Sequence, residues 1–335
     1  MKELVIISGK GGTGKTSLTA AFAALAGRSI IADCDVDAAD LHLLLRPTLR
    51  KREAFRGGDE AVIRAAECIG CGACLARCRF DAVIRAPADE PGAGARLSCD
   101  QCSDGCRRAC PVKYAGELEA LRELIGDAPE YVFRVEPLRC EGCGACVDAC
   151  PVGAIDFPER EAGEWFVSDT PCGPLVHARL EPGGENSGKL VTLVREAARS
   201  EARAAGLDQI LVDGPPGIGC TVIAAMTGAS LVLAVTEPTP SGAHDLKRVL
   251  QLARHFDLPA RVCVNKWDLF PAEADAIEAA ARTAGAPPVG RVRYDPHVWT
   301  ALSAGRNIVD CEGPAADDVR AVWNNLQNTL EKLPG

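Results

Sequence analysis

The sequence predicts an α/β protein with a doubly wound, mostly parallel sheet, interrupted by a smaller inserted α+β domain. Apolar runs that end in glycine or acidic residues alternate with helical patterns at both ends of the chain, which favours parallel strands connected by helices. Twelve of the seventeen cysteines lie in the region between these two parts. We therefore predict one α/β domain built from residues 1–59 and 158–335, with residues 60–157 inserted.

Composition limits the classes of function. The chain has 335 residues, 47% of them hydrophobic, and can bury a sizeable core. Its formal net charge of −9 argues against nonspecific nucleic-acid binding, which depends on lysine and arginine neutralising phosphates. We find no apolar stretch long enough to cross a bilayer or to form a signal peptide. We therefore expect a cytoplasmic protein with no membrane insertion and no nucleic-acid partner.

Residues 8–17 read SGKGGTGKTS, after the apolar run LVII and before the helical pattern LTAAFAALA. A strand, a glycine loop and a helix in this order form a phosphate-binding loop, in which backbone N–H groups and the helix N-terminus face phosphates. There Lys15 supplies a positive charge and the Thr16 hydroxyl ligates Mg2+. The second lysine, Lys10, is not needed for this task. The predicted nucleotide-binding residues are Gly11, Gly12, Thr13, Gly14, Lys15, Thr16 and Ser17.

Acidic residues follow two of the predicted strands. QILVDGPPGIGC at 209–220 reaches Asp213 and a glycine/proline turn, and SIIADCDVD at 29–37 reaches Asp33 and Asp35. The carboxyl ends of parallel strands meet at one sheet edge, where a carboxylate can orient magnesium-bound water. Asp35 and Asp213 are therefore predicted to act with the loop. Two further buried strands, LVLAVTEPT at 231–239 and ARVCVNKWD at 260–268, end in polar residues at the same edge.

The first and last cysteine runs, CIGCGACLARC and CEGCGACVDACP, share the spacing C-x2-C-x2-C-x3-C. In two-cluster ferredoxins, three cysteines of each run hold one cluster and the fourth reaches the other cluster. Zinc sites usually take pairs of ligands from two separated segments, so these dense runs favour clusters. The sequence thus predicts two 4Fe-4S clusters, one on Cys68, Cys71, Cys74 and Cys150 and the other on Cys140, Cys143, Cys146 and Cys78.

The middle run, CDQCSDGCRRACP, has a longer central gap and lacks the flanking sequence that the outer runs share. We interpret it as an insertion within the ferredoxin-like unit. Its four cysteines and terminal Cys-Pro favour a third cluster, with a structural zinc site or a set of cysteines without a ligand as the alternatives. The residues concerned are Cys99, Cys102, Cys106 and Cys110. Cys172 and Cys220 are expected to be buried structural cysteines, with metal or thiol chemistry as the alternative.

KGGTGKT, ADCDVDAADLHLLL, DGPPGIGC and the NKWD segment, together with the cysteine-rich insert, resemble the MinD/ParA/Mrp group of P-loop ATPases, in its subgroup with an inserted ferredoxin domain. The resemblance implies that Lys10 is the signature lysine of a deviant Walker A loop, which reaches the partner's phosphates in an ATP-bound dimer. It implies that Asp35 assists the attacking water, that Asp213 is the switch II acid and that Asn265 contacts adenine. NKWD, with Asp268, also fits the guanine-reading NKxD pattern, so GTP stays open as the alternative nucleotide.

Three functions follow from these features. In the first, an ATPase that uses ATP and Mg2+ couples its nucleotide state to electron transfer through the clusters to a partner protein. In the second, the chain assembles or inserts an iron–sulfur or other metal centre into a client metalloprotein. In the third, it is a nucleotide-dependent positioning switch that senses redox state. We expect slow hydrolysis without a partner, because no glutamine or arginine finger is evident near the acids. We also expect a homodimer or a heterodimer with a related ATPase.

Overall fold

The computed structural model describes residues 1–87, 131–182, 184 and 187–333. The middle cysteine run lies outside these residues. The chain divides into two compact units: a larger one of Met1–Phe55, Gly163–Leu180 and Asn186–Gly335, and a smaller one of Arg56–Ala162 and Glu181–Glu185. The predicted domain boundaries at residues 60 and 157 stay a prediction. Among the helices of the described segments, none combines the length and the apolar character needed to cross a bilayer.

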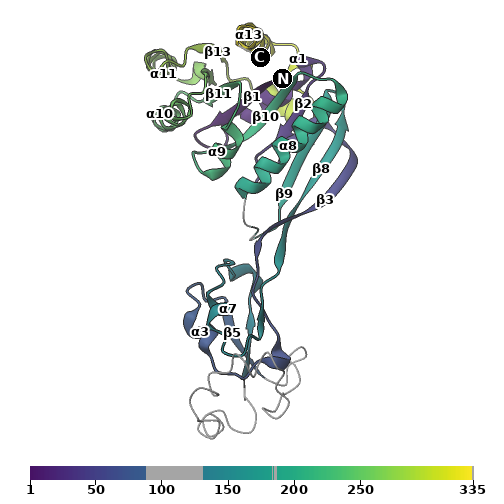
Figure 1. Cartoon of the computed structure of the whole chain (residues 1–335). Coiled ribbons are helices and arrows are strands. Elements are labelled where there is room, and N and C mark those ends of the chain that lie inside the picture. The colour runs from purple at the N-terminus through teal and green to yellow at the C-terminus, as the bar shows by residue number, and fades with distance from the viewer. Residues whose placement is uncertain (88–130, 183, 185–186, 334–335) are drawn as a thin grey trace, which may run out of the picture. The chain divides into compact units, whose positions relative to one another are not determined.

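The larger unit is built on a sheet that, within the described residues, has nine strands in the order β13-β12-β11-β1-β10-β2-β9-β8-β3 (Figure 1). Pairing is parallel from β13 to β9, and β8 is antiparallel to β9. The predicted α/β fold with a mostly parallel sheet is therefore confirmed. The strands are β1 (Lys2–Ser8), β2 (Ile30–Asp33), β3 (Thr48–Asp59), β8 (Glu159–Thr170), β9 (Gly173–Leu180), β10 (Gln209–Pro216), β11 (Leu231–Thr236), β12 (Ala260–Asn265) and β13 (Pro288–Val292).

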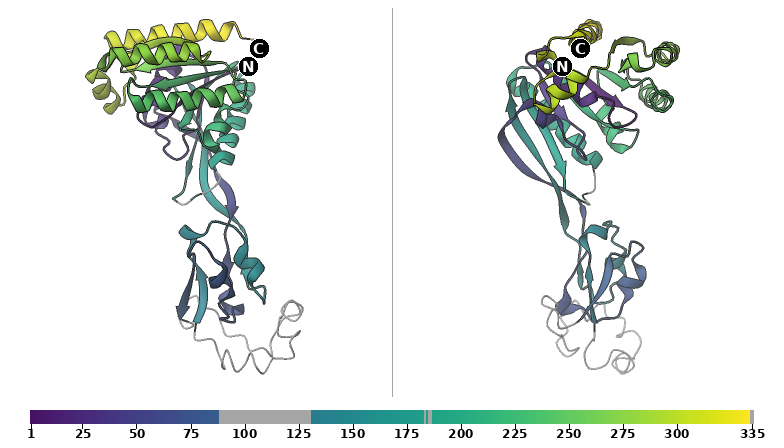
Figure 2. Two further views of the ribbon diagram at one scale, coloured as in Figure 1. Left: turned by 90° about the vertical axis from the view of Figure 1, so that its left-hand side faces the viewer. Right: turned by 180° about the vertical axis from the view of Figure 1, so that it is seen from behind.

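Helices cover both faces of the parallel strands, as Figure 2 shows for the larger unit. Leu4 and Ile6 of β1 belong to one apolar core with side chains of α1 and α13. Their neighbours Val5 and Ile7 are also fully buried, so the opposite face is covered as well. Burial on both faces explains why these strands read as continuous apolar runs. The helices are α1 (Lys15–Ala26), α2 (Leu41–Leu45), α8 (Ser187–Ala205), α9 (Cys220–Met226), α10 (Pro240–His255), α11 (Pro271–Thr283), α12 (Pro296–Ser303) and α13 (Pro314–Glu331).

The smaller unit repeats one structural motif. Each outer cysteine run follows a short 3-10 turn and contains a one-turn helix, α3 (Ala73–Arg77) in the first and α7 (Ala145–Ala149) in the second. Two antiparallel pairs complete the described part: β4 (Val62–Ile63) with β7 (Ile155–Asp156), and β5 (Val83–Pro87) with β6 (Tyr131–Val135). Cysteines of both runs join its small apolar core, which includes Phe133 and Ile155. Metal ligation by the cysteines would add to the stability of this core.

Candidate functional site

The glycine loop lies between the end of β1 at Ser8 and the start of α1 at Lys15. Gly14 has φ +89°, in the left-handed region that side chains rarely adopt, and a Cβ there would lie 2.4 Å from Asn265 Nδ2. A Cβ at Gly9 would lie 2.3 Å from the Cβ of Asp245 in α10. Close packing therefore requires glycine at both positions. The loop presents its backbone beside the N-terminus of α1, where a phosphate can accept hydrogen bonds.

Three aspartates meet at the carboxyl edge beside this loop. In the sheet register, Asp213 of β10 lies opposite Ile6 of β1 on one side and opposite Asp33 of β2 on the other. Lys15 Nζ contacts Asp35 Oδ2 at 2.6 Å, and both side chains are almost fully buried. The structure thus brings the predicted Lys15, Asp35 and Asp213 together. It pairs Lys15 with Asp35, so Lys15 must leave that carboxylate to bind a phosphate.

Thr16 and Thr19, on the first turns of α1, connect the helix to Asp213. Thr19 Oγ1 donates to Asp213 Oδ1 at 3.0 Å, and the Thr16 hydroxyl lowers the pKa of this carboxyl. In the described part of the chain, the buried Asp213 Oδ2 and Thr13 Oγ1 have no hydrogen-bond partner. A buried carboxylate oxygen without a donor is costly unless a cation or a bound water satisfies it. The arrangement of Thr16 and Asp213 therefore fits a hydrated Mg2+ ion.

The charges at this edge do not balance. Asp33, Asp35 and Asp213 face one buried cation, Lys15. Burial, followed by the charge of Asp213, raises the pKa of Asp33 well above its usual range. Burial likewise raises the pKa of Asp213, although Lys15, Thr16 and Thr19 oppose the shift. Burial would lower the pKa of Lys15, but Asp213 and Asp35 more than offset it and raise that pKa. The excess negative charge favours binding of a divalent cation.

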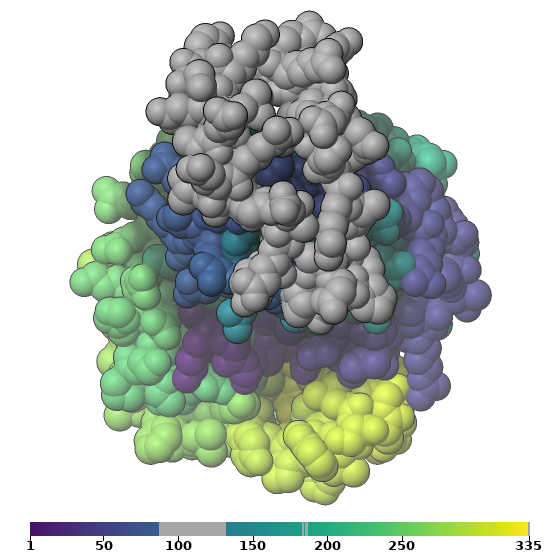
Figure 3. Space-filling view, turned by 90° about the horizontal axis from the view of Figure 1, so that it is seen from below, coloured from purple at the N-terminus to yellow at the C-terminus, as the bar shows by residue number. Residues whose placement is uncertain are grey.

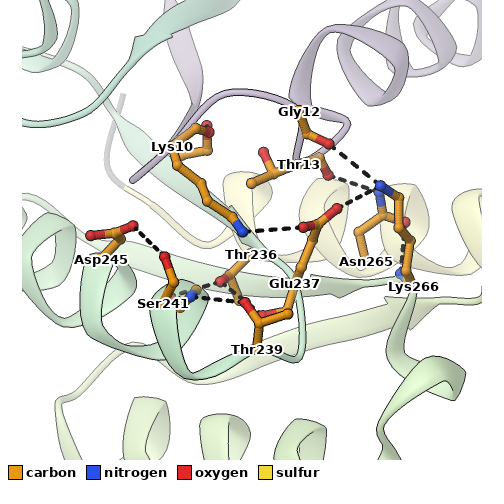
Figure 4. Close-up of polar contacts among 12 residues, drawn as sticks. Lys10, Gly12, Thr13, Thr236, Glu237, Thr239, Ser241, Asp245, Asn265 and Lys266 are labelled. Atoms are coloured by element: carbon orange, nitrogen blue, oxygen red, sulfur yellow. Dashed lines mark hydrogen bonds and ion pairs between the residues drawn. The ribbon is translucent and has the colours of Figure 1, made fainter.

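Lys10 lies apart from these acids and contacts Glu237, which follows β11 (Figure 4). Glu237 Oε2 is 3.4 Å from Lys10 Nζ, and its Oε1 is 2.5 Å from Lys266 Nζ. Lys266 Nζ also donates to Gly12 O at 3.5 Å. Glu237 therefore holds Lys10 against its own chain. Glu237 and Lys266 were not predicted as site residues from the sequence, although the position of Glu237 directly after a buried strand could have indicated it.

A cavity of about 230 Å³ opens beside the glycine loop, between Gly12, Gly14 and the segment around Tyr294 and Trp299. Its position and partly apolar lining suit a nucleobase. Asn265 lines this cavity, and its Nδ2 donates to Thr13 O at 2.8 Å. The predicted Asp268 does not line it, because its Oδ1 accepts the Tyr294 N–H at 2.6 Å. Asn265 thus holds the loop at the cavity, whereas Asp268 fixes the segment that forms the cavity wall.

The smaller unit has two further cavities, each lined by four of the predicted ligands. One is lined by Cys68, Cys71, Cys74 and Cys150. The other is lined by Cys78, Cys140, Cys143 and Cys146. Each set takes its fourth cysteine from the other run, as in the crossed assignment. Cluster binding itself stays a prediction.

The described cysteines of each set lie around a cavity and do not converge on one common position, as the ligands of a single metal ion would. In the described segments, no three His, Cys, Asp or Glu side chains converge closely enough to hold one metal ion. A zinc ion requires four sulfurs about 2.3 Å from its centre. The linings are largely apolar, with Phe133 in one cavity and Phe157 in the other. The two cavities therefore fit cubane clusters better than single ions.

The local electrostatics also suit a cationic iron core. Burial, and then the neighbouring Cys68, Cys71 and Cys150, raise the pKa of the Cys74 thiol to about 11. Four thiolates in this cavity therefore need a positive centre. Ala154 N–H donates to Cys150 Sγ at 3.2 Å. In the other cavity burial opposes ionisation, but backbone N–H groups such as that of Phe80 lower the pKa of Cys78. N–H groups directed at ligand sulfurs tune cluster potentials.

A parallel strand that leads through a glycine loop to Lys15, with buried acids on neighbouring strands, defines a P-loop nucleotide-binding protein of the α/β class. The chain belongs to the CobQ/CobB/MinD/ParA nucleotide binding domain family, whose model matches residues 4–308. This family assignment agrees with the resemblance that the sequence motifs carry. The chain is thus a member of the P-loop ATPase family.

Three similar proteins illustrate the two parts. The uncharacterized protein MJ0578 of Methanocaldococcus jannaschii is 31% identical over 276 residues, 79% of this chain and 78% of its own length. The polyferredoxin protein MvhB of Methanothermus fervidus is 33% identical over 100 residues, 28% of this chain and 21% of its own. The Pyrococcus horikoshii septum site-determining protein MinD, solved with Mg-ADP, has a TM-score of 0.52 and 17% identity, covering 98% of this chain and 96% of that one. At 17% identity, the similarity to MinD shows a shared fold and nothing more.

Proposed function

We propose that the chain is an ATP-binding and ATP-hydrolysing iron–sulfur protein that couples its nucleotide state to electron transfer, through 4Fe-4S clusters, to a partner protein. The main support is that one chain contains a P-loop site and two crossed four-cysteine cavities. The similarity to a polyferredoxin supports the redox half, and the family assignment supports the nucleotide half.

At the nucleotide site, the chain's own groups perform separate tasks. Lys15 and the loop N–H groups bind the β- and γ-phosphates, Thr16 and Asp213 hold Mg2+, and Asp35 orients the attacking water once Lys15 has left it. The metal would neutralise charge that develops on the phosphates. Because Lys15 and Asp35 are already paired at 2.6 Å, phosphate binding and release of Asp35 occur together. Nucleotide binding thereby changes the position of a switch residue.

The adenine base occupies the cavity beside Asn265, and ATP is the preferred nucleotide. Asp268 is the residue of the NKxD pattern that would read guanine, and its Oδ1 is already bonded to the Tyr294 backbone. Guanine would have to compete for that carboxylate. Competition between ATP and GTP for a fluorescent nucleotide measures the preference, and tighter GTP binding would reverse it.

Lys10 completes the site of a second chain. Its side chain is 34% exposed and lies away from the acids around Lys15 in its own site. An ATP-bound pair of chains, identical or related, would draw Lys10 away from Glu237 to the partner's phosphates. The γ-phosphate then holds the segments carrying Asp35 and Asp213 in one conformation.

The chain connects the two sites directly. β3 and β8 each contain residues of both units, and β3 follows Asp35 within the same segment of chain. Reduction of anaerobically loaded protein, with and without ATP, tests the coupling. If Lys15→Ala abolishes ATP binding together with every ATP effect on the clusters, the coupling stands. If ATP still affects the clusters in Lys15→Ala, the effect does not arise from ATP bound at the P-loop.

Assembly or insertion of a metal centre is the second candidate function. Cys71 and Cys143, one in each set, are exposed, and an exposed ligand favours cluster exchange. Transfer of iron and sulfide to an apo-ferredoxin separates the two functions. Stable clusters that cycle between redox states support electron transfer, whereas ATP-dependent loss of clusters to the acceptor supports assembly.

A further inference from the structure

The two cysteine runs form an internal repeat with one marked difference. Aligning Cys68 with Cys140 places Arg77 opposite Ala149, Arg79 opposite Pro151 and Phe80 opposite Val152. The second run thus has the Cys-Pro ending typical of bacterial ferredoxins, whereas the first has Cys-Arg. Two positive charges and one aromatic ring therefore occur at one end of an otherwise repeated unit.

These three residues lie beside the second cysteine set. Arg77, Arg79 and Phe80 line an open pocket of about 260 Å³ together with Cys143 and Ala145. Cys143 is exposed, and 45% of the Phe80 surface is exposed. Figure 3 shows part of the chain before residue 88, in blue, at the surface of the face drawn there. The pocket therefore joins a predicted cluster ligand to solvent.

Arg77 and Arg79 do not serve an evident structural role. Both are exposed, and within the described residues neither has a hydrogen bond or an ion pair. Other arginines of this unit are paired, such as Arg64 with Glu67 and Asp156. Arginine stays charged at any physiological pH. Two such charges lie beside an exposed thiolate ligand, on a chain whose net charge is −9.

We propose that this surface, formed by Arg77, Arg79, Phe80, Cys143 and Ala145, docks the acidic face of a small one-electron carrier of the ferredoxin or flavodoxin type. The proposal rests on the electron-transfer function proposed above. It assigns electron exchange to the cluster on Cys78, Cys140, Cys143 and Cys146. In the exchange, one electron passes from the reduced carrier to the oxidised cluster, with no bond made or broken.

The charges explain why such a carrier would select this surface. An acidic carrier is repelled by most of an acidic chain, so the two guanidinium groups orient its approach. They also offset the negative charge that the cluster gains with the electron. Phe80 adds an apolar contact at the centre of a polar rim, as in protein interfaces generally. The equivalent positions at the end of the second run are Ala149, Pro151 and Val152, and these residues carry no charge.

The test compares the double variant Arg77→Glu/Arg79→Glu with the wild type and a control, Lys247→Glu/Arg248→Glu. The control makes the same charge change on exposed residues of α10 in the larger unit. All three proteins are loaded anaerobically and must contain equal iron. A reduced acidic flavodoxin is the probe, and two quantities are measured: its Kd by titration and its rate of cluster reduction by stopped flow.

We expect the Arg77/Arg79 variant to lose about tenfold or more in association rate and affinity at an ionic strength of about 0.01 M. The difference should shrink at about 0.15 M, and the control should stay near wild type. Equal loss in both variants, or no loss in either, overturns the docking site, as does an arginine-dependent self-association of the chain. Arginine-dependent binding without electron exchange would support the surface and refute the electron-transfer function.

Discussion

Replacing Glu237 by glutamine should release Lys10 and favour the dimeric, ATP-bound state. In the structure, one carboxylate neutralises both Lys10 and Lys266, at 3.4 Å and 2.5 Å. Glutamine has nearly the same shape but no charge, so it removes the ion pairs and leaves the packing intact. If Lys10 acts on a partner's phosphates, the contact with Glu237 competes with dimerisation.

The size of the effect follows from the exposure of the pair. The Lys10 side chain is 34% exposed and that of Glu237 is 16% exposed, so solvent screens their attraction. A pair of this kind contributes about 0.2–1 kcal/mol. A symmetric dimer breaks two pairs, which together oppose association by about 0.4–2 kcal/mol. Glu237→Gln should therefore lower the dimer dissociation constant by about 2- to 30-fold.

Sedimentation with a slowly hydrolysed ATP analogue measures that constant. Glu312→Gln removes one carboxylate from an exposed position of the same unit and serves as the control. The control should dimerise like the wild type. An unchanged or weaker dimer in Glu237→Gln would refute the reasoning that Glu237 restrains Lys10.

Three further predictions follow from the site. Lys10→Ala should keep ATP binding by single chains but lose ATP-dependent dimerisation and hydrolysis; a variant that dimerises and hydrolyses like the wild type would show that Lys10 has no role in trans. Asp33→Asn replaces one carboxylate oxygen that accepts a backbone N–H from Asp35 or Leu41, so the variant should be less stable than the wild type at low pH. This deficit should shrink as pH rises, because a carboxyl whose pKa is raised on folding costs the wild type stability as pH rises from its ordinary pKa through the raised value. A difference in melting temperature that is the same at all pH would contradict this assignment. Cys150→Ser should remove the cluster of the first set and Cys78→Ser that of the second, each lowering bound iron by about four per chain; loss of the cluster of its own run in either variant would contradict the crossed assignment.

The sequence was sufficient to predict the buried parallel strands that appear as continuous apolar runs. Asp213 could be placed beside the glycine loop because β10 and β1 are apolar runs that must pair inside the sheet. The cysteine sets could be assigned because their spacing is fixed by the geometry of cluster ligation. Both predictions depend on local patterns with strong physical constraints.

Features that depend on long-range pairing were not predicted. The hairpin of β8 and β9 adds an antiparallel strand, β8, to the sheet. The sequence of β8, EREAGEWFVSDT, mixes charged and apolar residues without the regular alternation that predicts a strand. Glu237 and Lys266 lie 29 positions apart and meet only because β11 and β12 are neighbours. The pairing of Lys15 with Asp35 likewise appears only once β2 has been placed two strands from β1.

The central claim is that nucleotide state and cluster redox state are coupled within one chain. The most direct test is to purify the protein anaerobically, count iron and sulfide, and measure the reduction potentials with and without ATP and Mg2+. We predict at least about eight iron atoms per chain, with about twelve if the middle run binds a third cluster. A coupling free energy of about 1 kcal/mol would shift a one-electron potential by about 40 mV on ATP binding, and Lys15→Ala should abolish the shift. Fully loaded clusters whose potentials are identical with and without bound ATP would contradict the account.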